Sequence, residues 1–232
     1  MTNPEAQIPR HLGLILDGNR RWAKNRGLPT LDGHQEGAET LKTVALAAFD
    51  RGVEYVSAYA FSTENWKRTE DEVGYLMKLF MKAVELHLDT FHEAGIRVVI
   101  LGRREGLSGS VLKAFDRTEE KTKGNTRGTL ALCVNYGGQE ELVDAVKQIV
   151  ASGTAPAEIT KETVLGSLYH PEVPGIDLLV RTSGEHRTSG FMLYRSDYAE
   201  LYFTDVMWPD FNILELDKAL TDYARRKRRF GK

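Results

Sequence analysis

Six short runs rich in valine, isoleucine and leucine, separated by segments with helical periodicity, constrain the fold more than any other feature of this chain. The runs lie near residues 11–17, 53–61, 96–102, 129–136, 177–182 and 200–204. Most are continuously apolar, which is typical of strands covered on both faces. The pattern predicts an α/β fold: one domain over residues 1–232, with a central, mostly parallel six-stranded sheet flanked by helices.

A long helix is predicted from Glu70 to Ala94, with an apolar stripe wider than packing against a sheet requires. The stripe consists of Val73, Leu76, Met77, Leu79, Phe80, Met81, Ala83, Val84, Leu86, Leu88 and Phe91. Two interpretations stay open: a deeply buried core helix, or a helix that partly lines an apolar tunnel. Residues 153–175, which include three prolines, predict a surface excursion with one short helix near 160–168.

Composition favours a cytoplasmic protein. The chain has 232 residues, of which 41% are hydrophobic and 28% charged, which suits one compact domain. The first residues contain no basic segment leading into an apolar run, and no stretch approaches the roughly 20 apolar residues that span a bilayer. We therefore expect neither a signal peptide nor a membrane anchor. The single cysteine, Cys133, lies in an apolar run and is expected to be a buried core residue, so no disulfide or cysteine metal cluster is available.

The net charge of −2 gives no electrostatic reason to expect nucleic acid as a partner. One local exception is the basic run Arg225–Arg229. Such a run is compatible with a nucleic-acid patch, but it is more often a solvated helix face or a terminal contact.

Ligands of parallel α/β sheets bind beyond the carboxyl ends of the strands, so the residues after each apolar run matter most. After the first run come Asp17, Gly18, Asn19, Arg20, Arg21 and Trp22, with His34 further on. The chain has no G-x-G-x-x-G and no Walker lysine motif, which argues against dinucleotides and nucleoside triphosphates. A glycine turn opening a helix beside arginines suits a diphosphate. Asp17 would then hold Mg²⁺, or else act as an N-cap or a structural ion-pair partner.

Two further polar clusters follow the second and fifth runs, at residues 61–68 and 181–189. The second of them combines Arg181 and Arg187 with several hydroxyl groups, including Ser189. Two cationic loops at one edge of a sheet suggest two phosphate-bearing substrates. A salt-bridge network at a subunit contact would explain the arginines, but not the serine and glycine residues.

These residues, taken together, resemble the cis-prenyltransferases, the family of undecaprenyl diphosphate synthase. The resemblance runs from His11 to Gly231. It rests on residues 17–22, Gly33-His34, residues 59–66, Asn135-Tyr136-Gly137-Gly138, residues 181–187, residues 198–203 and Trp208-Pro209. The chain lacks the DDxxD motif of the all-helical trans-prenyltransferases, which fits the same resemblance.

The resemblance implies an enzyme that condenses isopentenyl diphosphate with an allylic diphosphate, such as farnesyl diphosphate, and leaves a cis double bond at each addition. It implies Mg²⁺ as the cofactor, held by Asp17 with help from Glu200. The allylic diphosphate would be bound by Gly18, Asn19, Arg20, Arg21, Trp22 and His34, and isopentenyl diphosphate by Arg181, Arg187 and Ser189. Asn65 would assist proton removal, in a reacting region shaped by Ser62, Glu64, Trp66 and Arg68.

The resemblance also implies a homodimer, or in some lineages a heterodimer, and a product that is delivered to the membrane as a precursor for cell-wall synthesis. Arg229-Phe230-Gly231 is similar to the C-terminal Arg-x-Gly motif, which in this family reaches towards the partner's active site. Undecaprenyl diphosphate is the expected type of product.

The chain departs from the family pattern at Thr30, where an arginine is usual, and at Thr69, Gly190 and Tyr194. Thr30 removes one contact to the allylic diphosphate unless Arg26 replaces it. Thr30 suggests one alternative, an enzyme that makes a short or branched product. Two others are a phosphate-binding regulatory module and a non-catalytic partner subunit, although a silent subunit would have no need of Asp17, Asn65, Arg181 and Arg187.

Overall fold

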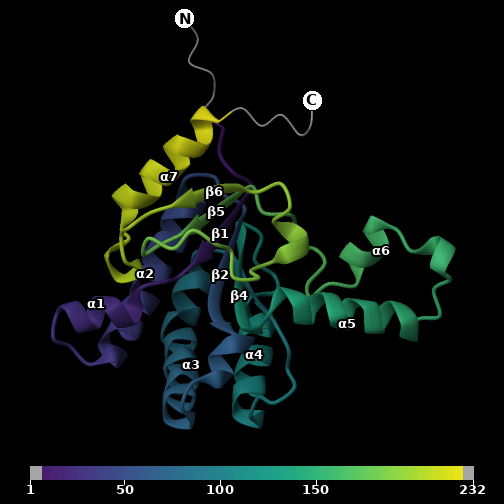
Figure 1. Ribbon diagram of the computed structural model, residues 1–232, viewed down its shortest axis with the longest axis horizontal. Helices are drawn as coiled ribbons and strands as arrows, with labels where there is room; N and C mark the ends of the chain where they lie inside the picture. Colours follow the sequence, from purple (N-terminus) through teal and green to yellow (C-terminus); the bar gives the residue numbers. More distant parts are fainter. Residues whose placement is uncertain (1–6, 227–232) are drawn as a thin grey trace, which may run out of the picture.

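The six apolar runs form six strands of one sheet in the computed structural model, which describes residues 7–226 (Figure 1). The strands are β1 (His11–Ile15), β2 (Tyr55–Ser62), β3 (Ile96–Leu101), β4 (Gly128–Tyr136), β5 (Leu178–Arg181) and β6 (Glu200–Phe203). Their order in the sheet is β3-β4-β2-β1-β5-β6. Each neighbouring pair is parallel. The predicted fold class is therefore confirmed, and the strand bounds differ from the predicted ones by only one or two residues.

The helices are α1 (Asn19–Asn25), α2 (Thr30–Asp50), α3 (Glu70–Glu93), α4 (Gly109–Thr122), α5 (Gly138–Ala151), α6 (Lys161–Gly166) and α7 (Ile213–Arg225). Helices α1 to α6 lie in the connections between β1 and β5, and α7 follows the last strand. Short 3-10 turns occur at η1 (Thr63–Lys67), η2 (Pro156–Glu158), η3 (Leu193–Arg195) and η4 (Trp208–Asp210). The start of α3 is set by Thr69, whose hydroxyl accepts from the backbone N–H of Glu72 and so satisfies one of the free donors of the first turn.

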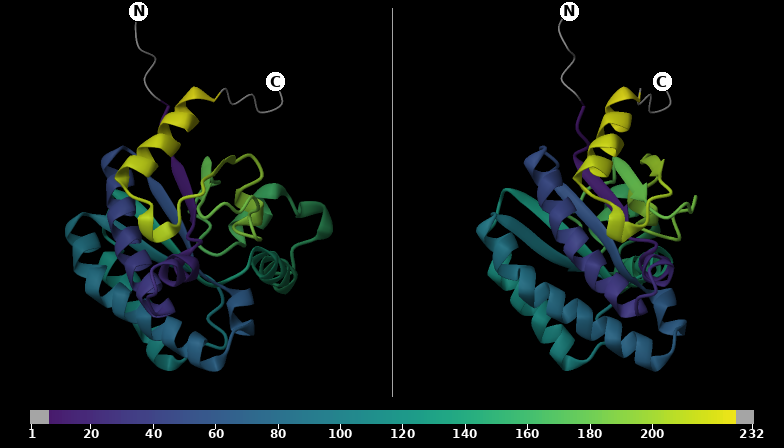
Figure 2. Two further views of the ribbon diagram at one scale, coloured as in Figure 1. Left: turned by 60° about the vertical axis from the view of Figure 1, so that its left-hand side comes forward. Right: turned by 90° about the vertical axis from the view of Figure 1, so that its left-hand side faces the viewer.

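Alternate residues of β1 to β5 enter two separate cores, as the twofold period of a strand requires. In β4, Leu130 and Leu132 pack on one face with residues of α2, α3, α4 and α7. Ala131 and Cys133 pack on the other face, and the burial of Cys133 confirms its predicted core role. Figure 2 shows α2, α3 and α4 side by side along the first face.

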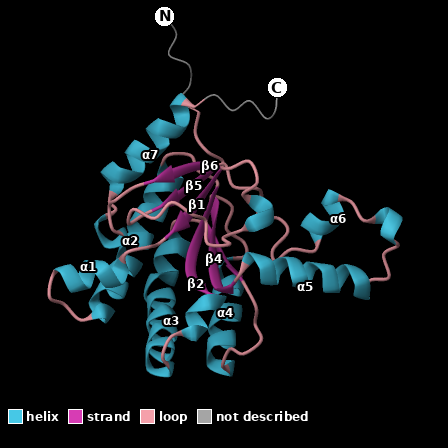
Figure 3. Ribbon diagram, viewed as in Figure 1, coloured by secondary structure: helices cyan, strands magenta, loops and turns pink. Residues whose placement is uncertain are grey.

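The second face is covered mainly by an irregular segment that includes Val173, Ile176 and Phe191, drawn largely as loop in Figure 3. The prediction of a sheet flanked by helices therefore holds for the first face, whereas the second face is covered mainly by loop. A buried ion pair holds the segment in place: Arg195 Nη1 lies 2.7 Å from Glu141 Oε1, and both side chains are almost fully buried. Arg195 also donates to the backbone carbonyls of Val173, Tyr169 and His170, and so satisfies backbone groups that have no sheet partner.

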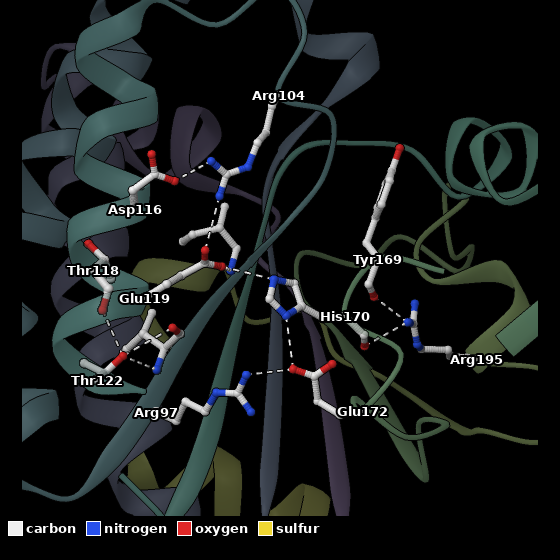
Figure 4. A network of polar contacts seen from close by, with 12 residues as sticks. Arg97, Arg104, Asp116, Thr118, Glu119, Thr122, Tyr169, His170, Glu172 and Arg195 are labelled. Carbon is white, nitrogen blue, oxygen red and sulfur yellow. Dashed lines mark hydrogen bonds and ion pairs between the residues drawn. The ribbon is translucent and has the colours of Figure 1, made fainter. Parts of the chain in front are cut away.

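The predicted surface excursion returns to the sheet through His170 (Figure 4). Its Nε2 lies 3.0 Å from Glu119 of α4, and its Nδ1 lies 3.2 Å from Glu172. Arg97 of β3 pairs with Glu172, and Arg104 pairs with Glu119. The hydrogen bond to Glu119, more than any other contact, raises the pKa of His170. The network thus fixes the end of the excursion to α4 and to the edge strand.

Within residues 7–226, none of the helices combines the length and the apolar character needed to cross a bilayer. The predicted Arg-x-Gly motif at Arg229-Phe230-Gly231 and most of the basic run 225–229 lie outside the described residues.

Candidate functional site

The loops after β1 and β5 lie side by side at the carboxyl edge of the sheet. β1 and β5 are paired neighbours, with Ile15 opposite Arg181. Arg181 Nη2 donates to Asp17 Oδ2 at 2.8 Å, and the Thr182 hydroxyl donates to the backbone carbonyl of Asp17 at 2.7 Å. The predicted closeness of the two cationic loops is therefore confirmed.

Gly18 makes the turn between Asp17 and α1 possible. Its φ of 108° lies in the left-handed region that favours glycine. A Cβ atom at this position would lie 2.9 Å from the Ser183 hydroxyl, which belongs to the neighbouring loop. The two loops therefore pack backbone against side chain, and a larger residue at position 18 would push them apart.

Arg181 is a buried cation that faces the cavity described below, with a side chain only 5% exposed. Its Nη1 donates to the carbonyl of Arg187 and to the Ser189 hydroxyl, both at 2.7 Å. Its Nε is buried and has no hydrogen-bond partner within the described chain. Arg187 differs, because it is exposed and pairs with Glu185 at 2.5 Å. A buried guanidinium with an unused donor favours an anionic ligand.

The loop after β2 is held by its own side chains. The Ser62 backbone N–H donates to Asn65 Oδ1 at 3.0 Å, and Trp66 Nε1 donates to Asn135 Oδ1 at 2.6 Å. Because the amide oxygen of Asn65 is engaged, its NH₂ donor is the group that it can offer to a ligand. An amide of this kind orients a substrate but is not itself a proton acceptor of any strength, so the predicted role of Asn65 in proton removal would be one of positioning.

A third group of charges lies where α1, α2 and α3 begin. Glu72 Oε1 lies 2.8 Å from Arg68 and 3.5 Å from Arg20. Next to them, His34 Nε2 is buried without a hydrogen-bond partner among residues 7–226. Burial, and after it the positive charge of Arg68, lowers the pKa of His34 to about 4. The imidazole is therefore neutral at pH 7 and can donate one hydrogen bond without adding charge.

One cavity of about 360 Å³ joins these groups to an apolar interior. Its polar lining near the strand ends comprises Asp17, Asn19, His34, Ser62, Asn65, Arg68, Arg181 and Ser189. Its apolar lining comes from α2, from the strands and above all from α3, which contributes Leu76, Leu79, Phe80, Ala83, Val84, Leu88 and Phe91. Of the two interpretations of the predicted stripe, the tunnel is therefore confirmed for these residues. Leu86 was wrongly included in the stripe: it is 62% exposed, because it lies on the outer face of the helix.

Other predicted site residues do not line the cavity. They are Gly18, Arg20, Arg21, Trp22, Arg26, Glu64, Trp66 and Arg187. Arg21 donates to the carbonyl of Ser183 and lies 3.5 Å from Asp17, so it remains close to the polar end. Glu64 and Arg187 are exposed.

Arg26, the predicted replacement for the arginine that is missing at Thr30, contacts Asp210 in this structure. Its Nη2 contacts both carboxylate oxygens of Asp210, at 3.1 and 3.0 Å, and its guanidinium stacks on the Trp22 ring. Trp22 Nε1 donates to the same carboxylate at 2.8 Å. Arg26 is therefore committed to a structural contact between α1 and η4, and its predicted ligand role is not supported within this chain.

Glu200 also lies elsewhere than predicted. It is the first residue of β6 and pairs in register with Leu178, whereas Arg181 pairs with Phe203 at the other end of the strand. Glu200 therefore lies at the amino edge of the sheet, where its carboxylate contacts Arg226 at 2.9 Å. Within one chain it does not share a metal with Asp17, because parallel strands keep their opposite ends apart.

The sequence interpretation missed four residues that organise the site. Thr182 donates a hydrogen bond to the backbone of Asp17. Glu72 lies between Arg68 and Arg20, and Glu185 contacts Arg21 and Arg187. Asp210 contacts Trp22 and Arg26. Thr182 and Glu185 carried a local signal, since both lie in the polar cluster at residues 181–189. The others hold functional side chains through pairings that depend on the tertiary fold.

Known proteins are similar to this chain in both sequence and fold. The family model described as "Putative undecaprenyl diphosphate synthase" matches residues 15–231. An isoprenyl transferase of Thermotoga maritima is 47% identical over 227 residues, which cover 97% of each chain. A trans,polycis-polyprenyl diphosphate synthase of Thermobifida fusca, named as specific for (2Z,6E)-farnesyl diphosphate, is 46% identical over 98% of this chain and 82% of its own.

Among solved structures, the lavandulyl diphosphate synthase of Lavandula x intermedia, in complex with dimethylallyl diphosphate, superposes with a TM-score of 0.94. Its sequence identity is 31%, over 97% of this chain and 99% of that chain.

Proposed function

The chain belongs to the undecaprenyl diphosphate synthase family, the cis-prenyltransferases, and we propose that it condenses isopentenyl diphosphate with farnesyl diphosphate to a polyprenyl diphosphate such as undecaprenyl diphosphate. The observation that carries this proposal is one cavity that has Asp17 and Arg181 at its polar end and the apolar stripe of α3 along its wall. A diphosphate group would fit the polar end of the cavity, and a growing hydrocarbon tail would fit its apolar interior. The product would serve as the precursor of a lipid carrier for cell-wall synthesis, and a cytoplasmic location stays a prediction.

The two diphosphates would occupy neighbouring subsites. Asn19, His34 and Arg68 offer donors to the allylic diphosphate on one side of Asp17. Arg181 and Ser189, which line the same cavity and contact each other, would offer donors to isopentenyl diphosphate. Held in this way, the double bond of isopentenyl diphosphate lies near the allylic carbon, which lowers the entropic cost of bringing two reactants together.

The reaction breaks the allylic carbon–oxygen bond, and the electron pair leaves with the diphosphate. The double bond of isopentenyl diphosphate forms the new carbon–carbon bond, and loss of a proton restores a double bond in the product. Negative charge grows on the leaving diphosphate, so fixed donors such as the guanidinium of Arg68 stabilise the transition state more than the bound substrate. The neutral ring of His34 adds a donor without adding charge.

Asp17 would hold Mg²⁺. No group of three or more His, Cys, Asp or Glu side chains that could hold a metal occurs within residues 7–226. Mg²⁺ nevertheless suits this site, because it keeps several waters and usually takes one or two carboxylates together with phosphate oxygens. The partly exposed carboxylate of Asp17 meets that requirement at the polar end of the cavity. When bound, the ion would neutralise charge on the leaving diphosphate.

The test is to incubate the purified protein with magnesium chloride, farnesyl diphosphate and labelled isopentenyl diphosphate. We expect extended products that disappear when EDTA is added. A protein that extends no allylic diphosphate of any length would contradict the proposal, and would leave the non-catalytic subunit or the phosphate-binding module.

A second candidate is an enzyme that makes a short or branched product. Two observations favour it: position 30 is a threonine while Arg26 is held by Asp210, and the fold superposes closely on a lavandulyl diphosphate synthase. Chromatography of the products formed from dimethylallyl diphosphate, with and without isopentenyl diphosphate, separates the two candidates. A linear polyprenyl series would rule out the second.

A homodimer would explain an apolar stripe on the outer face of α5. Val143, Val146 and Val150 are 49%, 56% and 71% exposed, and their spacing places them on one side of the helix. We propose this stripe as the dimer contact, since contiguous apolar surface is what such contacts bury. We expect light scattering after gel filtration to give twice the mass of the chain, and Val146→Lys to give a monomer. An unchanged mass for Val146→Lys would move the interface elsewhere.

A further inference from the structure

Tyr59 lines the cavity without belonging to the groups that would bind a diphosphate. It lies on β2 in register with Ile15 of β1, and Ile15 in turn lies opposite Arg181 of β5. Residues in register on neighbouring strands project to the same face of a sheet, so these three side chains form one row. All three line the cavity. Because neighbouring strands are about 4.8 Å apart, the two ends of the row are separated by roughly 10 Å at the backbone.

The row lies on the second face of the sheet, opposite to the apolar tunnel. Ile15 and Tyr59 pack with the second core, whereas Leu14, the preceding residue of β1, packs in the first core together with the apolar residues of α3. An allylic tail in the tunnel would therefore run along the first face. The isopentenyl group, attached to a diphosphate bound by Arg181 and Ser189, would lie over the second face, between Arg181 and Tyr59.

The ring of Tyr59 is held in a fixed orientation by its neighbours. It stacks on the ring of Phe191, with the ring centres 4.7 Å apart and the planes at 19°. It also makes an edge contact with Tyr136, at 6.0 Å between ring centres. Phe191 is fully buried and lies two residues after Ser189. Burial raises the pKa of the Tyr59 phenol, so the phenol keeps its proton and does not act as a base. The ring therefore offers a substrate a rigid wall and not a proton acceptor.

An irregularity at the end of β2 brings Tyr59 into the same cavity as the reacting groups. The register between β2 and β4 shifts between Tyr59 and Phe61, and again between Phe61 and Ser62. In a regular strand every second side chain would point away, but here Tyr59, Ala60, Phe61 and Ser62 all line the cavity. Such irregularities re-aim side chains next to active sites. Asn65, which follows in the same loop, lines the cavity as well.

We propose that Tyr59 sets the size of the pocket for the isopentenyl group and so determines which homoallylic diphosphate the enzyme accepts. This inference rests on the proposed function. The ring closes the row at the end away from Arg181, so a substrate with one more carbon on its methyl branch presses against it. The ring does not give way, because the buried Phe191 packs behind it. Discrimination by one methylene in an apolar pocket is worth roughly 10- to 200-fold in kcat/KM.

The experiment measures kcat/KM for isopentenyl diphosphate and for its ethyl analogue, in which ethyl replaces the methyl branch, at saturating farnesyl diphosphate and magnesium. Tyr59→Val should raise the ratio of the ethyl analogue to isopentenyl diphosphate by about tenfold, because the smaller side chain leaves space beside Ile15. Tyr59→Phe keeps the ring and should leave the ratio unchanged. Tyr55→Val is the matched control, since Tyr55 lies on the same strand and packs with the same core but does not line the cavity.

The outcomes separate this inference from the proposed function. If the unmodified protein extends no allylic diphosphate, the proposed function fails and this inference fails with it. If it does extend one, an unchanged ratio in Tyr59→Val, including an equal loss with both substrates, overturns only the role of Tyr59. The same rise in Tyr55→Val or in Tyr59→Phe would also overturn it, because the ring at this position would then not be responsible. Should Tyr59→Val fail to fold, as judged by circular dichroism, Tyr59→Leu provides the same comparison.

Discussion

Asp17 is positioned at the polar end of the cavity through both its side chain and its backbone. Arg181 binds the carboxylate, and Thr182 both donates to the Asp17 carbonyl and accepts from its N–H. This double attachment means that the main chain keeps its place when the carboxylate is removed. Residue 17 can therefore be changed to test chemistry separately from folding.

For Asp17→Ala we expect turnover to fall by roughly a hundredfold or more, the scale seen when a group that stabilises transition-state charge is lost. The thermal unfolding temperature should change little, because Thr182 still holds the backbone. Steady-state kinetics at saturating magnesium and a melting curve provide the measurement. Near-normal turnover in this variant would end the argument for a metal at Asp17.

For Gly18→Ala we expect lower stability, by about 1–3 kcal/mol, together with loss of activity, because both the left-handed φ and the contact with Ser183 oppose a side chain. Gly27→Ala is the matched control: its φ is also positive, at 66°, but a Cβ there would meet no atom within 4 Å. Chemical denaturation of both variants compares a glycine with a close contact and a more strained φ with one that has neither. Equal losses in the two variants would show that the packing against Ser183 is unimportant.

At the scale of elements, the excursion between α5 and β5 is attached through charges as well as through buried apolar residues such as Leu168 and Val173. His170 lies between Glu119 and Glu172, and Arg97 and Arg104 contact the same two carboxylates. Because the pKa of His170 is raised in the folded protein, the contribution of this network to stability depends on pH.

The direction of this pH dependence follows from the difference in the pKa of His170 between the folded and the unfolded protein. A histidine whose pKa is higher in the folded than in the unfolded protein stabilises the fold fully below its unfolded pKa of about 6.5, and the contribution is lost as pH rises through the folded pKa. We therefore expect His170→Asn to lower the unfolding temperature clearly at pH 6 and only slightly at pH 9. His92→Asn, at an exposed site, is the control. A gap between wild type and His170→Asn that does not shrink with pH would contradict the expectation.

At the scale of the whole molecule, the ion pair between Glu141 and Arg195 connects α5 to the segment that covers the second face of the sheet. Removing one member leaves the other charge buried and unpaired, so Glu141→Gln should lower stability by about 3 kcal/mol or more. Arg10→Ala, in a solvent-exposed pair with Glu54, should have little effect. Urea unfolding of the two variants provides the comparison, and similar midpoints would be evidence against a structural role for the buried pair.

The pattern of apolar runs was sufficient to predict the sheet, since strand positions and parallel pairing follow from local composition and from connection lengths. The polar clusters after β1 and β5 also followed from the sequence, because parallel strands bring their carboxyl ends to one edge. Asp17 and Arg181 were identified in this way. Such local rules predict at which edge of the sheet a residue lies, but not which side chains it contacts.

Only the tertiary structure decided which of these side chains face the cavity and which are engaged elsewhere. Arg26 lies close to the site in sequence, yet Asp210, far along the chain, holds it against Trp22. The position of Glu200 depended on the register between β5 and β6, which places it at the opposite edge from Asp17. His87 entered the tunnel wall because of how α3 is rotated against α2. Sequence determined the elements, whereas packing between distant segments determined their neighbours, since contact depends on register and rotation that no local pattern encodes.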